Sequence, residues 1–210
     1  MNILIDYGAG DGFFAEAALY PDRHLARITS QHKGLYKVMT NQGEKLAEIS
    51  GKFRHNAIAL SRYPAVGDFV MLSLPEADAG HAVIHHVLQR KSAFTRKAVG
   101  LEEQTQLVAA NIDIVFICMS LNNDYNLSRL ERYLSVAWNS RALPVIILTK
   151  ADLYADVSHI LDEISALAPG VDVVTTSIND QSSHDGLRSY LKPGITASFI
   201  GSSGDRKSVV

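Results

Sequence analysis

Apolar and polar positions follow two different periods along the chain, and the change of period separates it into two halves. In the first half, short apolar-rich runs alternate with turn signals such as Pro64 and Gly67, which is typical of β-strands. The predicted strands are 25–29, 35–39, 45–49, 68–72 and 82–88. Five short strands predict a small all-β barrel such as an OB-fold, with an SH3-like barrel as the alternative.

The second half alternates continuous apolar runs with runs of helical spacing. Residues 112–119 are nearly all apolar, as expected for a strand that is buried on both faces. Residues 127–138 and 160–167 have helical spacing, and we expect Tyr133 and Trp138 to lie in the core. Further strands are predicted at 144–148, 171–175 and 195–200. Strands that alternate with helices predict an α/β domain with a parallel sheet.

Composition limits the classes of protein that fit. The chain has 210 residues, 47% of them hydrophobic, which is enough for a buried core in one large or two small domains. The net charge of -2 excludes a global basic field that would attract nucleic acid. Cys118 is the single cysteine, so no intrachain disulfide forms, and neither a signal peptide nor a membrane-length apolar run is present. We therefore expect a soluble, cytoplasmic protein.

The predicted domains are a barrel with an N-terminal extension at 1–88, a basic linker at 89–103 and the α/β domain at 104–210. The linker is polar and carries Arg90, Lys91, Arg96 and Lys97, so it suits either rRNA contact or simple solubility. His81, His85 and His86 lie near one another, but no thiolate or well-spaced further ligand accompanies them. We therefore predict no metal site there.

Thr149-Lys150-Ala151-Asp152 directly follows the strand predicted at 144–148 and matches the guanine-specificity motif [NT]-K-x-D. One ionised carboxylate can accept both the N1–H and the 2-amino group of guanine, whereas adenine would leave it unpaired. The strand-end position also suits a ligand site in an α/β sheet. The alternative is a plain strand-to-helix turn in which Asp152 caps the helix. After the next strand, Thr175-Thr176-Ser177 resembles a segment whose backbone contacts the guanine oxygen in GTPases.

A candidate phosphate-binding loop follows the last predicted strand. In the pattern G-x-x-x-x-G-K-[ST], backbone N–H groups and the lysine hold phosphates, and the hydroxyl binds magnesium. Arg206 stands where the second glycine belongs, and Asp205 adds a carboxylate near the phosphates. Ser208 is the candidate magnesium ligand, and a disordered Ser/Gly tail is the alternative. The candidate loop residues are Gly201, Ser202, Ser203, Gly204, Asp205, Arg206, Lys207 and Ser208.

The order of these segments is informative, because ordinary GTPases place the phosphate loop before the guanine motif. The reverse order predicts a circularly permuted GTPase domain. On these segments the chain resembles the ribosome small-subunit-dependent GTPase A family, bacterial factors with a permuted GTPase domain behind an OB-fold. The resemblance rests on residues 64–68, 90–97, 106–113, 126–134, 148–153 and 199–204.

The resemblance implies binding of GTP and GDP, late maturation of the 30S ribosomal subunit, hydrolysis stimulated by that subunit, and contact with 16S rRNA. It assigns the guanine to Thr149, Lys150, Ala151 and Asp152 and the phosphates to residues 201–208. The sequence ends before the switch regions, the D-x-x-G magnesium motif and the zinc module of the family. We therefore expect a chain truncated at the phosphate loop, with weak nucleotide binding, negligible hydrolysis and no zinc.

The expected fold is thus an OB-fold followed by a partial, circularly permuted P-loop GTPase domain with a parallel sheet. A second hypothesis is a non-enzymatic module that binds rRNA or the ribosome through the barrel alone. A third is an ATP-binding phosphate-loop protein, which Lys150 and Asp152 disfavour.

Overall fold

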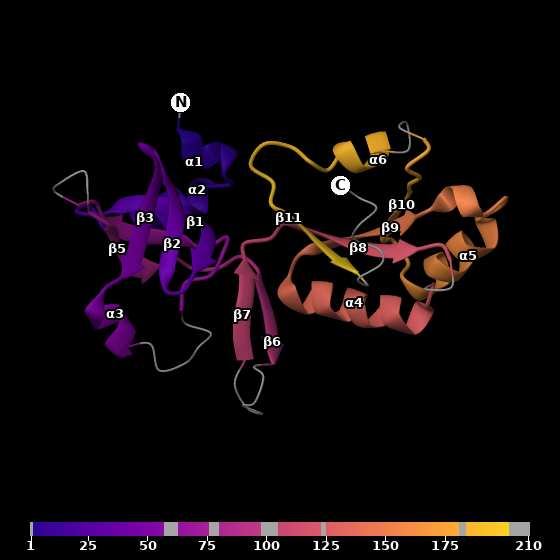
Figure 1. Cartoon of the computed structure of the whole chain (residues 1–210), viewed down its shortest axis with the longest axis horizontal. Coiled ribbons are helices and arrows are strands. Elements are labelled where there is room, and N and C mark those ends of the chain that lie inside the picture. The colour runs from indigo at the N-terminus through magenta and orange to yellow at the C-terminus, as the bar shows by residue number, and fades with distance from the viewer. Residues whose placement is uncertain are drawn as a thin grey trace. The chain divides into compact units, whose positions relative to one another are not determined.

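The computed structural model describes residues 2–56, 63–75, 80–97, 105–122, 125–180 and 184–201. Contacts divide the chain into two compact units, Met1–Ile112 and Asp113–Val210, whose elements are labelled in Figure 1. Within the segment 89–103 that the sequence predicts to be a linker, residues 93–97 form a strand.

The first unit is a closed five-stranded barrel in the order β1-β2-β3-β5-β4. Pairing of β1 with β4 closes the barrel. Strand β3 runs parallel to β5, and all other neighbouring strands of the barrel are antiparallel. Side chains at alternate positions, such as Ala26, Ile28, Tyr36 and Val38, fill the interior as the strand period requires. The predicted OB-like barrel and its five strands are confirmed: β1 (His24–His32), β2 (Leu35–Thr40), β3 (Gly43–Ile49), β4 (Phe69–Ser73) and β5 (Ala82–Val87).

Three short helices and a hairpin complete the first unit. Helix α1 (Ile3–Asp6) packs Leu4, and helix α2 (Asp11–Ala17) packs Phe13, onto the barrel residue Phe69. The ring centroids of Phe13 and Phe69 lie 4.2 Å apart. Helix α3 (Gly51–Asn56) follows β3 directly. Strands β6 (Ala93–Lys97) and β7 (Thr105–Ala110) form an antiparallel hairpin.

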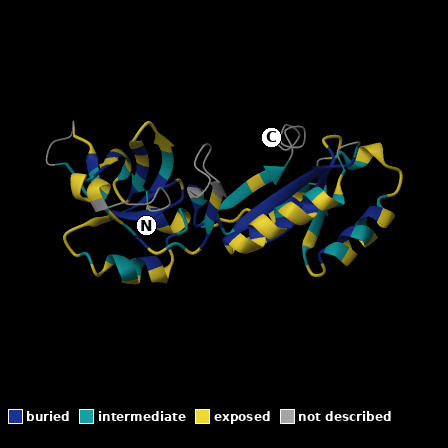
Figure 2. Ribbon diagram, turned by 90° about the horizontal axis from the view of Figure 1, so that it is seen from below, coloured by how far each residue is buried: buried dark blue, intermediate teal, exposed yellow. Residues whose placement is uncertain are grey.

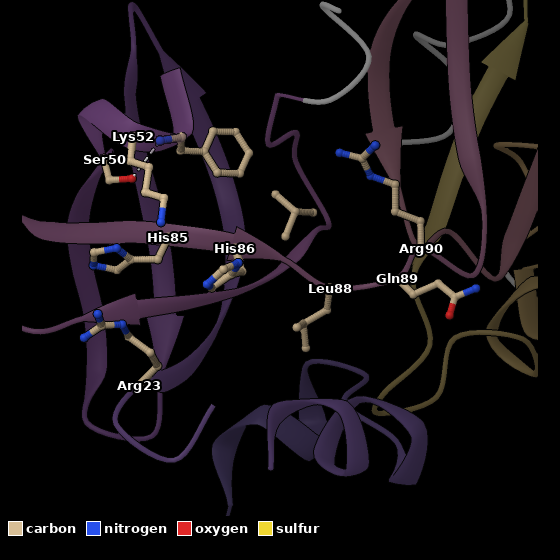
Figure 3. A pocket seen from close by; sticks show the side chains of 10 residues that line it. Arg23, Ser50, Lys52, His85, His86, Leu88, Gln89 and Arg90 are labelled. Atoms are coloured by element: carbon tan, nitrogen blue, oxygen red, sulfur yellow. Dashed lines mark hydrogen bonds between the residues drawn. The ribbon is translucent and has the colours of Figure 1, made fainter. Parts of the chain in front are cut away.

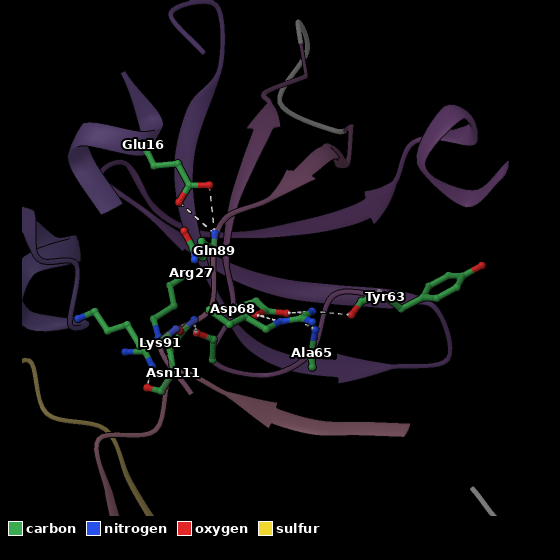
Figure 4. Close-up of polar contacts among 10 residues, drawn as sticks. Glu16, Arg27, Tyr63, Ala65, Asp68, Gln89, Lys91 and Asn111 are labelled. Atoms are coloured by element: carbon green, nitrogen blue, oxygen red, sulfur yellow. Dashed lines mark hydrogen bonds and ion pairs between the residues drawn. The ribbon is translucent and has the colours of Figure 1, made fainter. Parts of the chain in front are cut away.

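A buried polar network ties the barrel to this hairpin (Figure 4). The Asp68 carboxylate is fully buried and accepts two hydrogen bonds from the Arg90 guanidinium, at 2.7 and 2.8 Å. Asn111 bridges the segments, since its amide nitrogen donates to the Gly67 carbonyl and its amide oxygen accepts from the Lys91 backbone N–H. These hydrogen bonds therefore hold together the segments 64–68 and 90–97, which are distant in sequence.

The second unit is a parallel four-stranded sheet in the order β10-β9-β8-β11. Every residue of β8 is buried, and Figure 2 shows the two central strands in dark blue. The predicted strands and helices are confirmed within a few residues at their ends: β8 (Ile114–Ser120), α4 (Leu127–Ser140), β9 (Leu143–Thr149), α5 (Ser158–Leu167), β10 (Asp172–Thr175) and β11 (Ala197–Gly201). A short helix, α6 (Asp185–Arg188), packs Leu187 against Phe116 and Cys118 on one face of the sheet.

Asn126 caps the start of helix α4, since its side chain accepts a hydrogen bond from the Arg129 backbone N–H. Its buried stripe is Leu130, Leu134 and Ala137, whereas Trp138 is 52% exposed. The prediction of a core position for Trp138 is therefore wrong. At about 100° per residue, position 138 lies roughly 80° around the helix from Leu130, beyond the stripe.

Candidate functional site

The carboxyl ends of the four parallel strands lie along one edge of the sheet in the second unit. Ser120 pairs with Thr149, Leu148 with Thr175, and Cys118 with Gly201. From β8 the chain steps outward to β9 and β10, and then returns to place β11 on the other side of β8. Such a reversal of strand order is where open α/β sheets bind ligands.

This edge brings together the two segments singled out in the sequence. The guanine motif follows β9 and the candidate phosphate loop follows β11, with only β8 between them. Two strand spacings amount to about 10 Å, which is within the span of one nucleotide. Of the loop, the structure describes Gly201, and Ser202, Ser203, Gly204, Asp205, Arg206, Lys207 and Ser208 lie outside the described residues.

The loops that follow β9 and β10 interlock through backbone hydrogen bonds. Lys150 adopts a left-handed conformation, with φ of 61°, and turns the chain into a short 3₁₀ helix, η2 (Ala151–Leu153). The Ala151 N–H donates to the Thr176 carbonyl at 3.1 Å, and the Thr176 N–H donates to the Leu148 carbonyl at 2.8 Å. The Lys150 ammonium lies 3.5 Å from the hydroxyl of Ser120, so it reaches across to the end of β8.

The Asp152 carboxylate is exposed and held by side chains of the loop after β10. Oδ1 accepts a hydrogen bond from the Ser177 hydroxyl at 2.7 Å, and Oδ2 accepts one from the Asn179 amide at 3.1 Å. The Ser177 bond, followed by smaller contributions that include Asn179, holds the pKa of Asp152 below its usual value. A carboxylate has about four acceptor positions, so each oxygen keeps capacity for another donor.

Asp152 does not cap α5, because the N-cap of that helix is Val157 and no side chain makes a capping hydrogen bond there. The alternative reading of a capping turn therefore does not describe Asp152. Sequence reasoning singled out Ser177 but missed Asn179. The available signal was a second side-chain donor, the Asn179 amide, two residues after Ser177 in the loop that follows β10.

A cavity of about 190 Å³ opens beside this carboxylate. Leu153 and Ile178 contribute apolar walls, although they are 60% and 74% exposed. The hydroxyl of Thr149 is buried and has no hydrogen-bond partner among the described residues, which is costly unless another group supplies one. The volume lies below the roughly 300 Å³ of the smallest drug-sized sites, so it suits a planar base better than a whole nucleotide.

In the described part of the chain, no group of three or more His, Cys, Asp or Glu side chains is arranged to hold a metal ion. No helix in the described ranges is both long and apolar enough to cross a membrane.

Similarity to known proteins decides the family of this chain. Residues 87–210, more than half of the chain, match the RsgA GTPase family. The chain belongs to the RsgA GTPase family. It is 42% identical over 207 residues to the small ribosomal subunit biogenesis GTPase RsgA 2 of Lactiplantibacillus plantarum, covering 99% of this chain and 58% of that protein. It is 44% identical over 210 residues to RsgA 1 of Listeria innocua, covering 98% and 57%. This RsgA-family chain thus spans little more than half the length of these curated relatives.

Solved structures agree with the fold. YjeQ from Thermotoga maritima superposes with a TM-score of 0.70 at 26% identity, covering 88% of this chain and 62% of YjeQ. YloQ, described as a circularly permuted GTPase, superposes with a TM-score of 0.63 at 24% identity, covering 87% and 61%, and supports the fold alone. The family and the permuted fold predicted from sequence are therefore confirmed. In the sheet, the last strand in the chain, β11, lies beside β8, the first strand of this unit.

Proposed function

We propose that this edge of the sheet binds a guanine nucleotide, with the base beside Asp152 and the phosphates beyond Gly201. The observation that carries the proposal is the exposed Asp152 carboxylate, oriented by Ser177 and Asn179 and still able to accept two donors. Its lowered pKa favours the ionised form that accepts both N1–H and the 2-amino group of guanine. Adenine presents an acceptor at N1 and would leave the carboxylate unpaired.

The neighbouring residues take supporting roles in this proposal. The Lys150 stem lies along the base while its ammonium stays near Ser120. The buried Thr149 hydroxyl receives a partner when the phosphate-loop side of the site is complete. Ala151 fixes the loop through its bond to Thr176, which supports the position of Asp152.

We propose that residues 201–208 contact the phosphates, with Lys207 neutralising charge and Ser208 as the candidate magnesium ligand. Arg206 in place of glycine adds a side chain where the backbone approaches the phosphates, and Asp205 adds a negative charge. Phosphoryl transfer depends on positioning and on stabilisation of developing charge. We therefore expect this chain alone to bind GTP and GDP weakly and to hydrolyse GTP negligibly.

At the level of the cell, we propose a role in maturing the small ribosomal subunit in the cytoplasm. The names of the relatives, small ribosomal subunit biogenesis GTPases, support this role. Because the alignments cover about 98% of this chain, they also support assigning the role of the relatives to it. In this proposal the 30S subunit stimulates hydrolysis and 16S rRNA is part of the binding surface. The guanine site then sets how tightly the factor binds the subunit.

Titration with fluorescent mant-GDP and its xanthine counterpart tests the guanine assignment. Asp152→Asn should weaken GDP binding by about a hundredfold or more, because the asparagine amide group would face a donor of guanine with a donor of its own. The same amide group can donate to the 2-carbonyl oxygen of xanthine, so the variant should favour the xanthine nucleotide. Asp156→Asn is the matched control: the same change four residues away, at an exposed side chain whose remaining amide oxygen can still accept the Ser158 N–H. GDP affinity that Asp152→Asn leaves unchanged, or equal affinity for ADP and GDP, would contradict the proposal.

A further inference from the structure

A second cavity, of about 680 Å³, opens in the first unit on the β5 side of the barrel (Figure 3). Small-molecule sites in proteins are clefts of about 300–1,000 Å³, so this volume is sufficient for a ligand the size of a metabolite. Its walls combine basic side chains and the hydroxyl of Ser50 with the apolar side chains of Phe53, Val87 and Leu88. Apolar walls with a few polar groups are typical of small-molecule sites.

Two consecutive residues of β5, His85 and His86, line this cavity. Side chains normally alternate between the two faces of a strand, so neighbours in sequence do not share a face. On β4, the consecutive residues Met71 and Leu72 pair with His86 and Ile84, respectively. His85 is therefore an extra residue in β5, a β-bulge, and bulges change the direction of side chains beside functional sites. The bulge accounts for both imidazoles reaching one cavity.

Residues outside the lining hold both imidazole rings in place. The Nε2 of His85 lies 3.0 Å from the Ser73 hydroxyl. The ring of His86 packs against Tyr20, with 4.5 Å between the ring centroids. When the groups that contact a ligand are already held, less conformational freedom is lost on binding. The two rings therefore form a prepared wall of the cavity.

The charge of the lining has one sign. None of the ten lining residues is Asp or Glu, and the basic ones are Arg23, Lys52, His85, His86 and Arg90. Asp68 neutralises Arg90, but neither Arg23 nor Lys52 forms an ion pair with a described residue. In Figure 3 the side chains of Lys52 and Arg23 lie on either side of His85. Because the net charge of the chain is -2, this cluster is not a consequence of overall basicity.

An aromatic side chain lines the same cavity. Phe53 is half-buried, and its backbone N–H donates to the Ser50 hydroxyl at 3.1 Å. Its ring lies edge-on to Tyr63, with 6.5 Å between the ring centroids. Aromatic rings prefer offset-stacked or edge-to-face partners, so a ring held in this way favours a ligand that carries a ring of its own.

We propose that this cavity binds a small phosphate monoester with an aromatic body, in which Arg23, Lys52 and His85 hold the phosphate and Phe53 packs against the ring. A phosphate suits this set of donors better than a carboxylate, because it has three terminal oxygens for three separate side chains. The guanidinium of Arg23 can also donate two parallel hydrogen bonds to one phosphate. The proposal rests on the barrel unit alone and not on the guanine site.

The imidazole of His85 should report the anion directly. Burial, and then repulsion from Arg23 and His86, lowers the pKa of His85 in the empty cavity. A phosphate beside the ring would offset this repulsion and favour the charged imidazolium. The pKa of His85 should therefore rise when the ligand binds.

NMR titration of the 210-residue chain with phenyl phosphate tests the site, because this probe has a phosphate monoester and a ring but no nucleoside. The His85 signals should shift, and the pKa of His85 should rise. Arg23→Gln and Lys52→Gln should each weaken binding about threefold to fivefold. Phe53→Leu should weaken binding of phenyl phosphate about threefold and leave binding of inorganic phosphate unchanged, because it removes a ring contact and no charge.

Lys37→Gln is the matched control, since it removes the same charge from an exposed position on β2, outside the cavity. Equal weakening by Lys37→Gln and Lys52→Gln would mean that phenyl phosphate responds to overall charge, and would overturn the proposal. Thermal melting of each variant separates lost binding from lost folding.

The positions of the shifted NMR signals distinguish this site from the guanine site. Shifts at Gly201 without shifts at His85 or Phe53 would place the phosphate at the guanine site and contradict the proposal. Shifts at His85 with a single-stranded oligonucleotide, but none with phenyl phosphate, would assign the cavity to a nucleic acid and refute the small-molecule site. Mant-GDP affinity is measured in parallel, so failure of the guanine proposal is recognised independently.

Discussion

The two units of the chain carry cavities of opposite chemistry, which arise in different ways. In the sheet unit, loops after parallel strands present the Asp152 carboxylate beside apolar walls in a cavity of about 190 Å³. In the barrel unit, cationic side chains line a cavity of about 680 Å³, and none of the lining residues is Asp or Glu. A carboxylate suits the N–H donors of a base, and cations suit phosphate. The comparison therefore contrasts a cavity whose lining suits a base with a cavity whose lining suits an anion.

The units also differ in how they are stabilised. Each barrel strand has neighbours on both sides, and a buried ion pair joins the barrel to the hairpin. In the described part of the sheet unit, β10 and β11 each pair on one side only, and its ion pairs lie at the surface. Substitutions at the polar joint should thus affect barrel stability strongly, whereas substitutions at the sheet edge should affect binding with little loss of stability.

The largest expected effect is that of Gly67→Ala. Gly67 has φ of +91°, and a Cβ there would lie 2.0 Å from the Ala110 carbonyl oxygen. Backbone strain and a clash with backbone that cannot move away together should cost about 4 kcal/mol. Thermal unfolding measures the loss, and hydrogen exchange should show it in β1, β4 and β7 and not in β8 and β9.

Gly34→Ala is the control for Gly67→Ala. Its φ of +87° is similar, but nothing lies within 4 Å of an added Cβ. Only the conformational cost remains, about 1 kcal/mol. Equal losses for the two variants would mean that the close approach to Ala110 contributes nothing.

Asp68→Asn should have the next largest effect. It leaves the Arg90 guanidinium, whose side chain is only 20% exposed, without its carboxylate partner. Breaking a buried pair in this way should cost about 3 kcal/mol in chemical unfolding. Asp185→Asn breaks a surface pair with Arg188 in the sheet unit, where the side chains are 69% and 74% exposed, and should cost less than about 0.5 kcal/mol. Similar losses in the two variants would remove the contrast between the units.

Ser177→Ala should leave stability nearly unchanged and act on the guanine site. The Ser177 hydrogen bond is the largest cause of the lowered pKa of Asp152, so its loss should raise that pKa toward the ordinary value of 3.8. A lowered pKa keeps the carboxylate ionised as the pH falls, and the variant should therefore lose GDP affinity at a higher pH than the parent chain. At neutral pH we expect about fivefold weaker binding in mant-GDP titrations. An unchanged pH midpoint would show that Ser177 does not control Asp152.

Most of the fold was predictable because its signals are local. The alternation in residues 25–49 and the apolar run at 112–119 are visible without any distant contact. Helices α1 and α2 were missed because they have four and seven residues, and such short helices depend on tertiary packing, here against Phe69. The hairpin was missed because its first strand is polar, and its place is set by Asn111 and the Asp68–Arg90 pair, which join distant segments.

The position of the candidate guanine motif at the end of β9 was predictable for the same reason, since Thr149 to Asp152 are contiguous and follow an apolar strand. Asn179 was not, because its bond to Asp152 spans 27 residues and depends on how two loops meet. The basic cavity was equally hidden, because Arg23, Lys52 and His85 come together only when the barrel closes.

The smallest expected effect is that of Trp138→Gln, and it tests where the apolar stripe of α4 ends. Trp138 is 52% exposed, so its replacement should change the free energy of unfolding by less than about 0.5 kcal/mol. Leu134, one turn earlier and 1% exposed, is the matched position, and Leu134→Ala should cost about 2–5 kcal/mol through the cavity it leaves. Urea unfolding followed by circular dichroism compares the two without relying on tryptophan fluorescence. A loss at Trp138 that approaches the loss at Leu134 would mean that another part of the protein covers this side of α4.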